Sequence, residues 1–161
     1  MLRIKEKNAV SALFELDTLE DTSAFGKAVS EVLTPGMTLL MYGELGAGKT
    51  TLVREICRSL GWYRTCSPSF SLVNEYARAR IPIAHADLYR VENADGRDFG
   101  FDDYLDEGWV LIVEWPERLI NSDFIETWSV KITEARERRI IKITADGHDS
   151  ETALRRLEEL L

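Results

Sequence analysis

The most informative stretch of this sequence is Gly43-Glu44-Leu45-Gly46-Ala47-Gly48-Lys49-Thr50, which has the pattern G-x-x-x-x-G-K-T. A short apolar run over residues 37–42 precedes it. Apolar residues recur at helical spacing after it, namely Leu52, Val53, Ile56, Cys57 and Leu60. We therefore predict a buried strand, a glycine-rich loop and a helix in succession, which is the context that a phosphate-binding P-loop requires.

The residue types of this loop suit the phosphates of a nucleotide. Glycines let successive backbone N–H groups turn toward the phosphates, and the N-terminus of the helix adds a partial positive charge. Lys49 is expected to contact the β- and γ-phosphates, and the Thr50 hydroxyl to bind Mg²⁺. We therefore predict an ATP·Mg²⁺ site. Its expected nucleotide-binding residues are Gly43, Glu44, Leu45, Gly46, Ala47, Gly48, Lys49, Thr50 and Thr51.

A second apolar run, over residues 110–113, ends in Glu114. P-loop sites carry a carboxylate at the end of a neighbouring buried strand. Glu114 would hold Mg²⁺ directly or through water, or orient the attacking water. An acidic residue after an apolar strand is common, so this interpretation depends on the P-loop upstream.

Two further segments allow two interpretations each. His85 and Asp87 point to the same face of a strand, and Asp87 would then be a second carboxylate of the site. On spacing alone we favour the simpler alternative, in which Asp87 caps a loop and His85 packs at the edge of the core. Residues 67–71 read Ser-Pro-Ser-Phe-Ser and follow the P-loop helix. They form either a loop that senses the γ-phosphate or an ordinary Ser-Pro turn.

Composition limits the class of protein. The 161 residues are 45% apolar and 30% charged, which fits one globular domain over residues 1–161. The formal net charge of −8 makes strong autonomous binding of nucleic acid an unfavourable expectation. Two cysteines and two histidines give neither a disulfide framework nor zinc-ligand spacing. We see no signal peptide and no membrane-spanning run, so a cytoplasmic protein without membrane contact is expected.

The rest of the chain predicts a mixed α/β fold. We expect a helix over residues 22–33, extended segments over 70–76 and 81–90, a loop with a short helix over 92–108, a hairpin formed by 128–133 and 139–145, and a C-terminal helix over 150–161.

Four segments, in this order and spacing, resemble the bacterial TsaE (YjeE-like) family of P-loop ATPases, which serve tRNA threonylcarbamoyladenosine biosynthesis. They are residues 43–51, 67–76, 85–90 and 112–119, and the resemblance extends from about residue 20 to residue 145. It implies a single P-loop domain whose mixed β-sheet is flanked by helices, with a C-terminal β-hairpin and helix.

The resemblance also implies roles for individual residues. Lys49, Asp87 and Glu114 would be catalytic, and Thr50, Glu114 and Asp87 would bind the metal. Ser69 would belong to a switch-like loop near the nucleotide. Thr18 would border the adenine, and Glu117 would lie near the nucleotide. Three positions depart from the family pattern, since Glu44 replaces an Asp, Ser69 replaces a Thr, and Cys66 stands where the family commonly has Thr or another small or polar residue.

The family's partner is a TsaD–TsaB heterodimer that transfers threonylcarbamoyl to adenosine 37 of tRNA. The resemblance implies an accessory ATPase that is weak alone, is activated by this heterodimer and meets tRNA only through it. The acidic charge of the chain agrees with such an indirect role.

Three other readings of the P-loop remain for comparison. A GTPase is disfavoured because the chain has no Asn-Lys-x-Asp motif for guanine. A small-molecule or nucleoside kinase would need an acceptor pocket and an Arg-rich lid, whereas the arginines of residues 136–139 are diluted by acids. A non-enzymatic protein that uses ATP only as a conformational ligand is harder to separate from an ATPase.

Overall fold

The structure is a computed structural model that describes residues 1–7, 10–68 and 71–161. Its principal strands are β1 (Arg3–Lys7), β2 (Ser11–Leu16), β3 (Thr38–Tyr42), β4 (Val73–Tyr76), β5 (Ile83–Asp87), β7 (Val110–Glu114), β9 (Thr127–Ala135) and β10 (Arg138–Asp146). The helices are α1 (Leu19–Val32), α2 (Lys49–Ser59), α3 (Phe101–Asp106) and α4 (His148–Leu160), with single 3₁₀ turns at η1 (Gly96–Phe99) and η2 (Pro116–Arg118).

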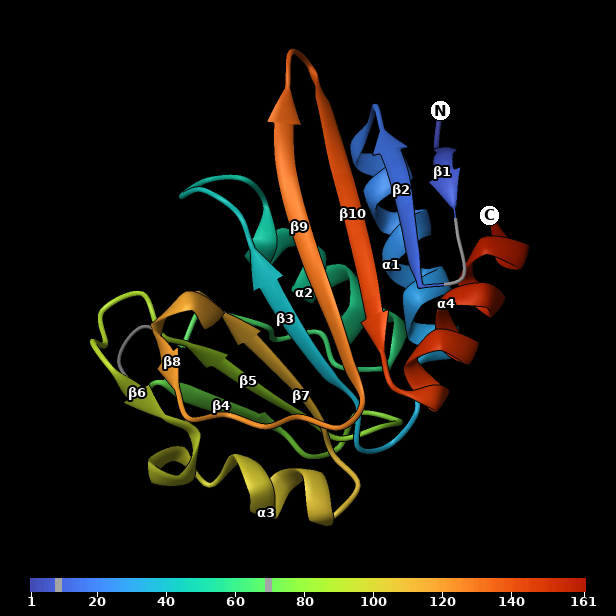
Figure 1. The fold of residues 1–161 in the computed structure, drawn as a ribbon. Helices are drawn as coiled ribbons and strands as arrows, with labels where there is room; N and C mark the ends of the chain where they lie inside the picture. The colour runs from blue at the N-terminus through green and yellow to red at the C-terminus, as the bar shows by residue number, and fades with distance from the viewer. Residues whose placement is uncertain (8–9, 69–70) are drawn as a thin grey trace.

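The eight strands form one mixed sheet in the order β1-β2-β10-β9-β3-β7-β5-β4 (Figure 1). Strands β9, β3, β7 and β5 run parallel to one another, and the remaining pairs are antiparallel. The short strands β6 (Ala94–Asp95) and β8 (Leu119–Ile120) pair separately. Since parallel strands end at a common edge, the ends of β3, β5 and β7 bring three polar segments of the sequence together.

Helices cover both faces of the central strands, which explains why those strands read as apolar runs rather than alternating ones. Ile83, Val110 and Ile112 join the core that includes residues of α1, α2 and α4. Leu111 and Val113 point to the other face and pack in the cluster that contains Phe101 of α3. All five residues of β7 are buried, including Glu114 at its end.

The fold class predicted from the sequence is confirmed, as are the strand–loop–helix unit, the short helix in 92–108, the C-terminal hairpin and the final helix. Strands β1 and β2 were not predicted, although Ala12, Phe14 and Leu16 of β2 alternate with less buried residues in the manner of a half-buried strand. Within the described ranges, no helix is long and apolar enough to cross a bilayer.

Candidate nucleotide-binding site

The glycine-rich loop leaves β3 and turns sharply into α2. Gly43, Gly46 and Gly48 all have positive φ values, of 155°, 81° and 103°. A Cβ atom at Gly43 would lie 2.8 Å from the carbonyl oxygen of Ile132, so this position accepts only glycine without a shift of the backbone. No described side chain caps the N-terminus of α2. The first N–H groups of this helix are therefore suited to an anionic ligand.

Lys49 opens α2, and only 6% of its surface is exposed. Its ammonium group donates to the carbonyl oxygens of Gly43 and, over 3.2 Å, of Glu44. The same nitrogen lies 4.1 Å from the centre of the Trp115 ring. No carboxylate forms an ion pair with Lys49 in the part of the chain that the structure describes. Its positive charge is therefore compensated by dipoles and a ring face, not by a counter-ion.

Thr50 and Glu114 meet at the base of the loop. The Thr50 hydroxyl donates to Oε1 of Glu114 over 2.9 Å, from the first turn of α2 to the end of β7. The other oxygen of Glu114, Oε2, lies 2.6 Å from Nε2 of His85. Both His85 and Glu114 are buried. The strand order thus joins residues that are 29 and 64 positions apart in the sequence.

Asp87 lies beside this pair, since it ends β5 and is in register with Glu114 of β7. Its carboxylate accepts from the Ser67 hydroxyl over 3.1 Å and from the backbone N–H of Tyr89 over 3.0 Å. Among described residues, no hydrogen bond joins Asp87 to Thr50 or Glu114. Asp87 therefore caps the turn after β5 and also ties Ser67 to the sheet edge.

The chemistry of these side chains fits Mg²⁺. The described residues contain no group of three or more His, Cys, Asp or Glu side chains that could hold a metal. Magnesium in nucleotide sites does not need such a group, because it takes one or two carboxylates together with phosphate oxygens and waters. The Thr50 hydroxyl and the Glu114 carboxylate supply oxygen donors of the required kind.

One hollow is lined by residues of the loop, and a smaller one near it is lined by none of them. The larger, of about 590 Å³, is lined by Gly43, Glu44, Leu45, Ala47, Trp115, Glu117 and residues 131–134. The smaller, of about 200 Å³, is lined by residues 16–19, Glu134 and residues 137–139. Glu134 lines both, so the hollows are neighbours. Glu117, which the sequence suggested as a peripheral contact, therefore lines the hollow at the P-loop, and Thr18 lines the neighbouring hollow, whose wall contains no residue of that loop.

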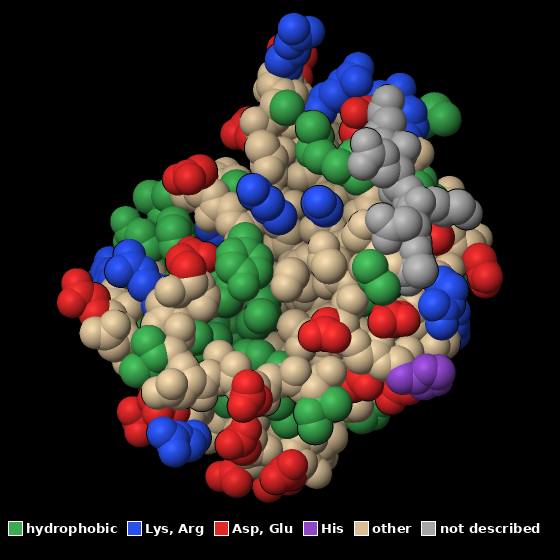
Figure 2. Space-filling view, in the orientation of Figure 1, with side chains coloured by type: hydrophobic (Ala, Val, Ile, Leu, Met, Phe, Trp, Pro, Cys, Tyr) green, Lys and Arg blue, Asp and Glu red, His purple; other side chains and the backbone are tan. Residues whose placement is uncertain are grey.

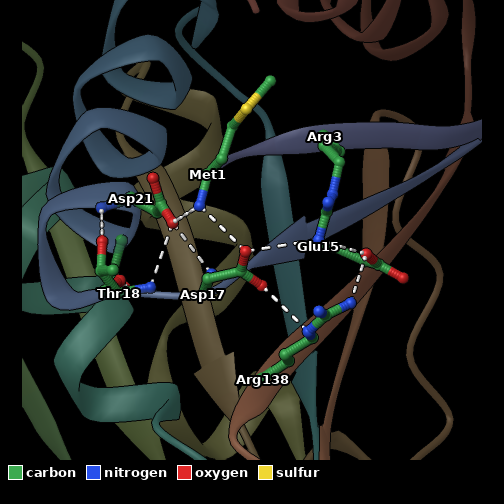
Figure 3. Close-up of polar contacts among 8 residues, drawn as sticks. Met1, Arg3, Glu15, Asp17, Thr18, Asp21 and Arg138 are labelled. Carbon is green, nitrogen blue, oxygen red and sulfur yellow. Dashed lines mark hydrogen bonds and ion pairs between the residues drawn. The ribbon is translucent and has the colours of Figure 1, made fainter.

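A network of charges holds the wall of the smaller hollow (Figure 3). The Asp17 carboxylate forms three ion pairs. Its oxygens lie 3.0 Å from the Met1 amino nitrogen and 3.3 Å from a guanidinium nitrogen of Arg3 and of Arg138. Asp21 completes the capping box of α1 with Thr18. The Met1 amino group, followed by the backbone N–H groups of Asp17 and Thr18, lowers the pKa of Asp21 to about 2.

Arg139 is a site residue that the sequence did not reveal. Its guanidinium group lies beside the backbone of Gly48, where an added Cβ would be 3.1 Å from Nε and Cζ. It also donates to the Thr22 hydroxyl of α1 over 3.3 Å. The sequence predicts that Arg139 begins the second strand of the hairpin, next to a turn whose arginines are diluted by acids. Only the pairing of β10 with β9 and β2 places it against the phosphate loop.

A group of acidic side chains lies away from this site. Figure 2 shows Asp and Glu side chains gathered over the lower part of the view, where Figure 1 places α3. Asp102, Asp103 and Asp106 belong to that helix, which precedes the amino end of β7. The P-loop lies at the opposite, carboxyl edge of the parallel strands. The acidic face is therefore not aimed at the P-loop.

Proteins that place such a loop between a buried parallel strand and a helix, with a carboxylate on the next strand, form the P-loop class of nucleotide-binding proteins, and this chain falls in that class. Its family can be stated more narrowly. The model of the family described as threonylcarbamoyl adenosine biosynthesis protein TsaE matches residues 16–141, and the chain belongs to that family.

Individual relatives agree with this assignment. The chain is 41% identical over 106 residues to the tRNA threonylcarbamoyladenosine biosynthesis protein TsaE of Nostoc sp., covering 62% of this chain and 65% of that protein. It is 34% identical over 128 residues to the Aquifex aeolicus TsaE, covering 78% and 90%. The crystal structure of Bacillus subtilis YdiB superposes with a TM-score of 0.76 at 27% identity, over 98% of this chain and 97% of that one.

The structure thus brings most of the predicted site residues to one place. Thr50 and Glu114 meet directly, Lys49 precedes Thr50 and contacts the loop carbonyls and Trp115, Asp87 lies on the adjacent strand, and Thr51 lies in the first turn of α2. Ser69 lies outside the described residues. The roles of all these residues in binding and catalysis stay predictions.

Proposed function

We propose that this chain binds ATP with Mg²⁺ in its P-loop and hydrolyses it, as an accessory ATPase for N6-threonylcarbamoyladenosine formation at position 37 of tRNA. The observation that carries the proposal is the hydrogen bond between Thr50 and Glu114 under a loop whose lysine has no described carboxylate partner. A hydroxyl and a carboxylate for the metal thus adjoin a cation for the phosphates.

Each of these side chains then has one task. Lys49 holds the β- and γ-phosphates, and Thr50 and Glu114 hold the metal. Bound Mg²⁺ neutralises charge on the phosphates and so favours attack by water. Asp87 is the second carboxylate of the site. Its hydrogen bond keeps Ser67 at the carboxyl edge of the sheet, where the γ-phosphate would lie. Ser69 belongs to the segment that follows.

The two hollows supply the outer contacts. We assign the hollow at Thr18 to the adenine and place Glu117 near the nucleotide, in the hollow at the loop. Arg139 adds a second cation next to Gly48, at the N-terminus of α2. The site therefore balances the negative charge of ATP with Lys49, Arg139 and the metal, and holds the base between α1 and β10.

The partner that we propose is the TsaD–TsaB heterodimer. Curated relatives are named for tRNA threonylcarbamoyladenosine biosynthesis, and the net charge of −8 argues that another protein holds the tRNA. The chain would then act in the cytoplasm as one P-loop unit over residues 1–161. Weak hydrolysis by the free protein and activation by the heterodimer follow from such an arrangement.

The test is ATP hydrolysis by the purified chain, measured alone and with the TsaD–TsaB heterodimer, with Lys49→Ala as the blank. We expect a low rate that rises with the heterodimer and is lost in Glu114→Gln. Absence of hydrolysis above the blank in both conditions would contradict the ATPase proposal. Transfer of phosphate to an added metabolite would favour a kinase. Full tRNA modification with Glu114→Gln would show that ATP binding alone suffices.

A further inference from the structure

Glu114 is held through both of its carboxylate oxygens. Thr50 donates to Oε1 over 2.9 Å, and Nε2 of His85 lies 2.6 Å from Oε2. His85 is fully buried, and Glu114 is 2% exposed. Water therefore has little access to the Glu114 carboxylate from the side of β5. The contact with the His85 ring fixes the direction of Oε2 of Glu114.

Tyr76 fixes the orientation of that ring. Its hydroxyl oxygen lies 2.9 Å from Nδ1 of His85 and 3.2 Å from the carbonyl oxygen of Cys66. A carboxylate oxygen can only accept and a neutral imidazole carries one hydrogen, so Nε2 of His85 donates to Glu114 and Nδ1 accepts from the Tyr76 hydroxyl, whose hydrogen is shared with the Cys66 carbonyl oxygen. Burial raises the pKa of Tyr76 to about 12, which keeps this hydroxyl a donor at neutral pH.

The Tyr76 ring is itself held in place. It stacks on Trp62 with ring centres 5.3 Å apart and an angle of 27° between the planes. The carbonyl of Cys66 also accepts from Asn74, two residues earlier on β4, over 3.2 Å. The next residue, Ser67, is bound to Asp87. The segment 66–67 is therefore attached to β4 and β5 through side chains that lie beside the P-loop carboxylates.

We propose that His85 and Tyr76 are positioning residues that hold the Glu114 carboxylate toward Thr50 and connect it to the backbone of Cys66. The series Cys66–Tyr76–His85–Glu114–Thr50 then keeps the metal-binding side of the P-loop and the segment before Ser69 in one geometry. This inference rests on the proposed function, because Glu114 binds a metal only within it. A histidine buried merely for packing would not make nucleotide binding depend on which of its two nitrogens is replaced.

The test compares two polar replacements of His85. His85→Gln can place an amide nitrogen near the position of Nε2 and keep a donor to Glu114. His85→Asn places its amide near Nδ1 and leaves Oε2 of Glu114 without that donor. The dissociation constant of ATP is measured by calorimetry with Mg²⁺ and again in a chelator, for each variant and the native chain.

We expect His85→Asn to reduce the magnesium-dependent gain in ATP affinity by about tenfold, the scale on which hydrogen-bond partners of metal ligands act. His85→Gln should recover most of that gain, and both variants should bind ATP normally in the chelator. His148→Asn is the matched control, because His148 is the other histidine of the chain and is exposed at the start of α4.

Tyr76→Phe tests the connection to Cys66 and keeps the test valid if His85→Asn does not fold, since the ring and its stacking on Trp62 remain. We expect the exposed Cys66 thiol to react faster with a thiol reagent, and the magnesium-dependent gain to fall as well. Tyr104→Phe is the control, because it removes a hydroxyl that donates to Glu75, outside this series.

Several results would overturn the inference. One is that both His85 variants lose the magnesium-dependent gain in ATP affinity equally, and another is that neither variant loses it. A third is that ATP affinity falls by the same factor with and without magnesium. A faster Cys66 reaction in Tyr76→Phe without a change in the magnesium-dependent gain would refute the connection. If the native chain itself shows no magnesium-dependent ATP binding, the proposed function fails, and that outcome is distinct from all of these.

Discussion

Lys49 has the most informative surroundings of any single residue in the site. A buried ammonium group is costly unless its charge is compensated, and here two carbonyl oxygens and the Trp115 ring provide only part of that compensation. Phosphate oxygens are the ligand that would complete it. Trp115 adopts a left-handed conformation with φ of 60°, which is strained for a bulky residue and directs its ring over the lysine.

Gly48 gives a prediction at the same scale. Gly48→Ala should lower the free energy of unfolding by about 2–3 kcal/mol, because the left-handed backbone is strained for alanine and the new methyl group meets the Arg139 guanidinium. Gly46→Ala is the matched control, since its φ is also positive but nothing lies within 4 Å of the added carbon. It should cost about 1 kcal/mol.

Urea unfolding of both variants provides the measurement. An equal decrease in the free energy of unfolding for Gly48→Ala and Gly46→Ala would mean that Arg139 does not rest against the loop. Nothing in the sequence around residues 136–139 predicted this contact, because the two partners lie on β10 and on the P-loop. The Tyr76–His85 contact escaped prediction for the same reason. Lys49 and Thr50 could be predicted because a local motif identifies them, and Glu114 because it ends an apolar run in a chain that has this motif.

At the scale of elements, the N-terminus of α1 shows how a local signal sets a boundary. The sequence predicted a helix from residue 22, on its apolar spacing alone. The structure begins α1 at Leu19, because Thr18 accepts from the Asp21 N–H and Asp21 accepts from the Thr18 N–H. This capping box is readable in the sequence. Strand β1, by contrast, has the charged sequence Arg-Ile-Lys-Glu-Lys and gains its strand character only by pairing with β2.

The capping box also predicts a dependence on pH. The pKa of Asp21 is lowered from 3.8 to about 2 by the Met1 amino group first and then by backbone N–H groups. A carboxylate whose pKa is lower in the folded than in the unfolded chain stabilises the fold at pH values above its unfolded-state pKa. This stabilisation is lost as the pH falls from about 4 toward 2. Asp21→Asn should therefore lower the melting temperature at pH 7, and the difference from the native chain should shrink over that acidic range.

Thermal unfolding followed between pH 2 and pH 7 would measure this difference. Asp106→Asn, which changes an exposed carboxylate on α3, is the control and should leave the melting temperature nearly unchanged at all pH values. A constant difference between Asp21→Asn and the native chain over the whole range would contradict the assignment of the lowered pKa to this capping carboxylate.

At the scale of the whole molecule, strand order explains why a site exists at all. Residues 43–50, 87 and 114 come from three separate parts of the sequence, and they meet because β3, β7 and β5 are adjacent and parallel. The apolar runs over 37–42 and 110–113 predicted buried strands, but not their neighbours. The order of the sheet depends on long-range pairing, so it could be anticipated only from the resemblance to a known family.

The central claim is that this loop binds ATP together with Mg²⁺. Calorimetric titration of the purified chain with ATP, in the presence of Mg²⁺, tests it most directly when Lys49→Ala is titrated beside it. We predict one ATP bound per native chain and no measurable binding by a folded Lys49→Ala protein. Equal ATP binding by the two proteins would contradict the assignment of the nucleotide to the P-loop.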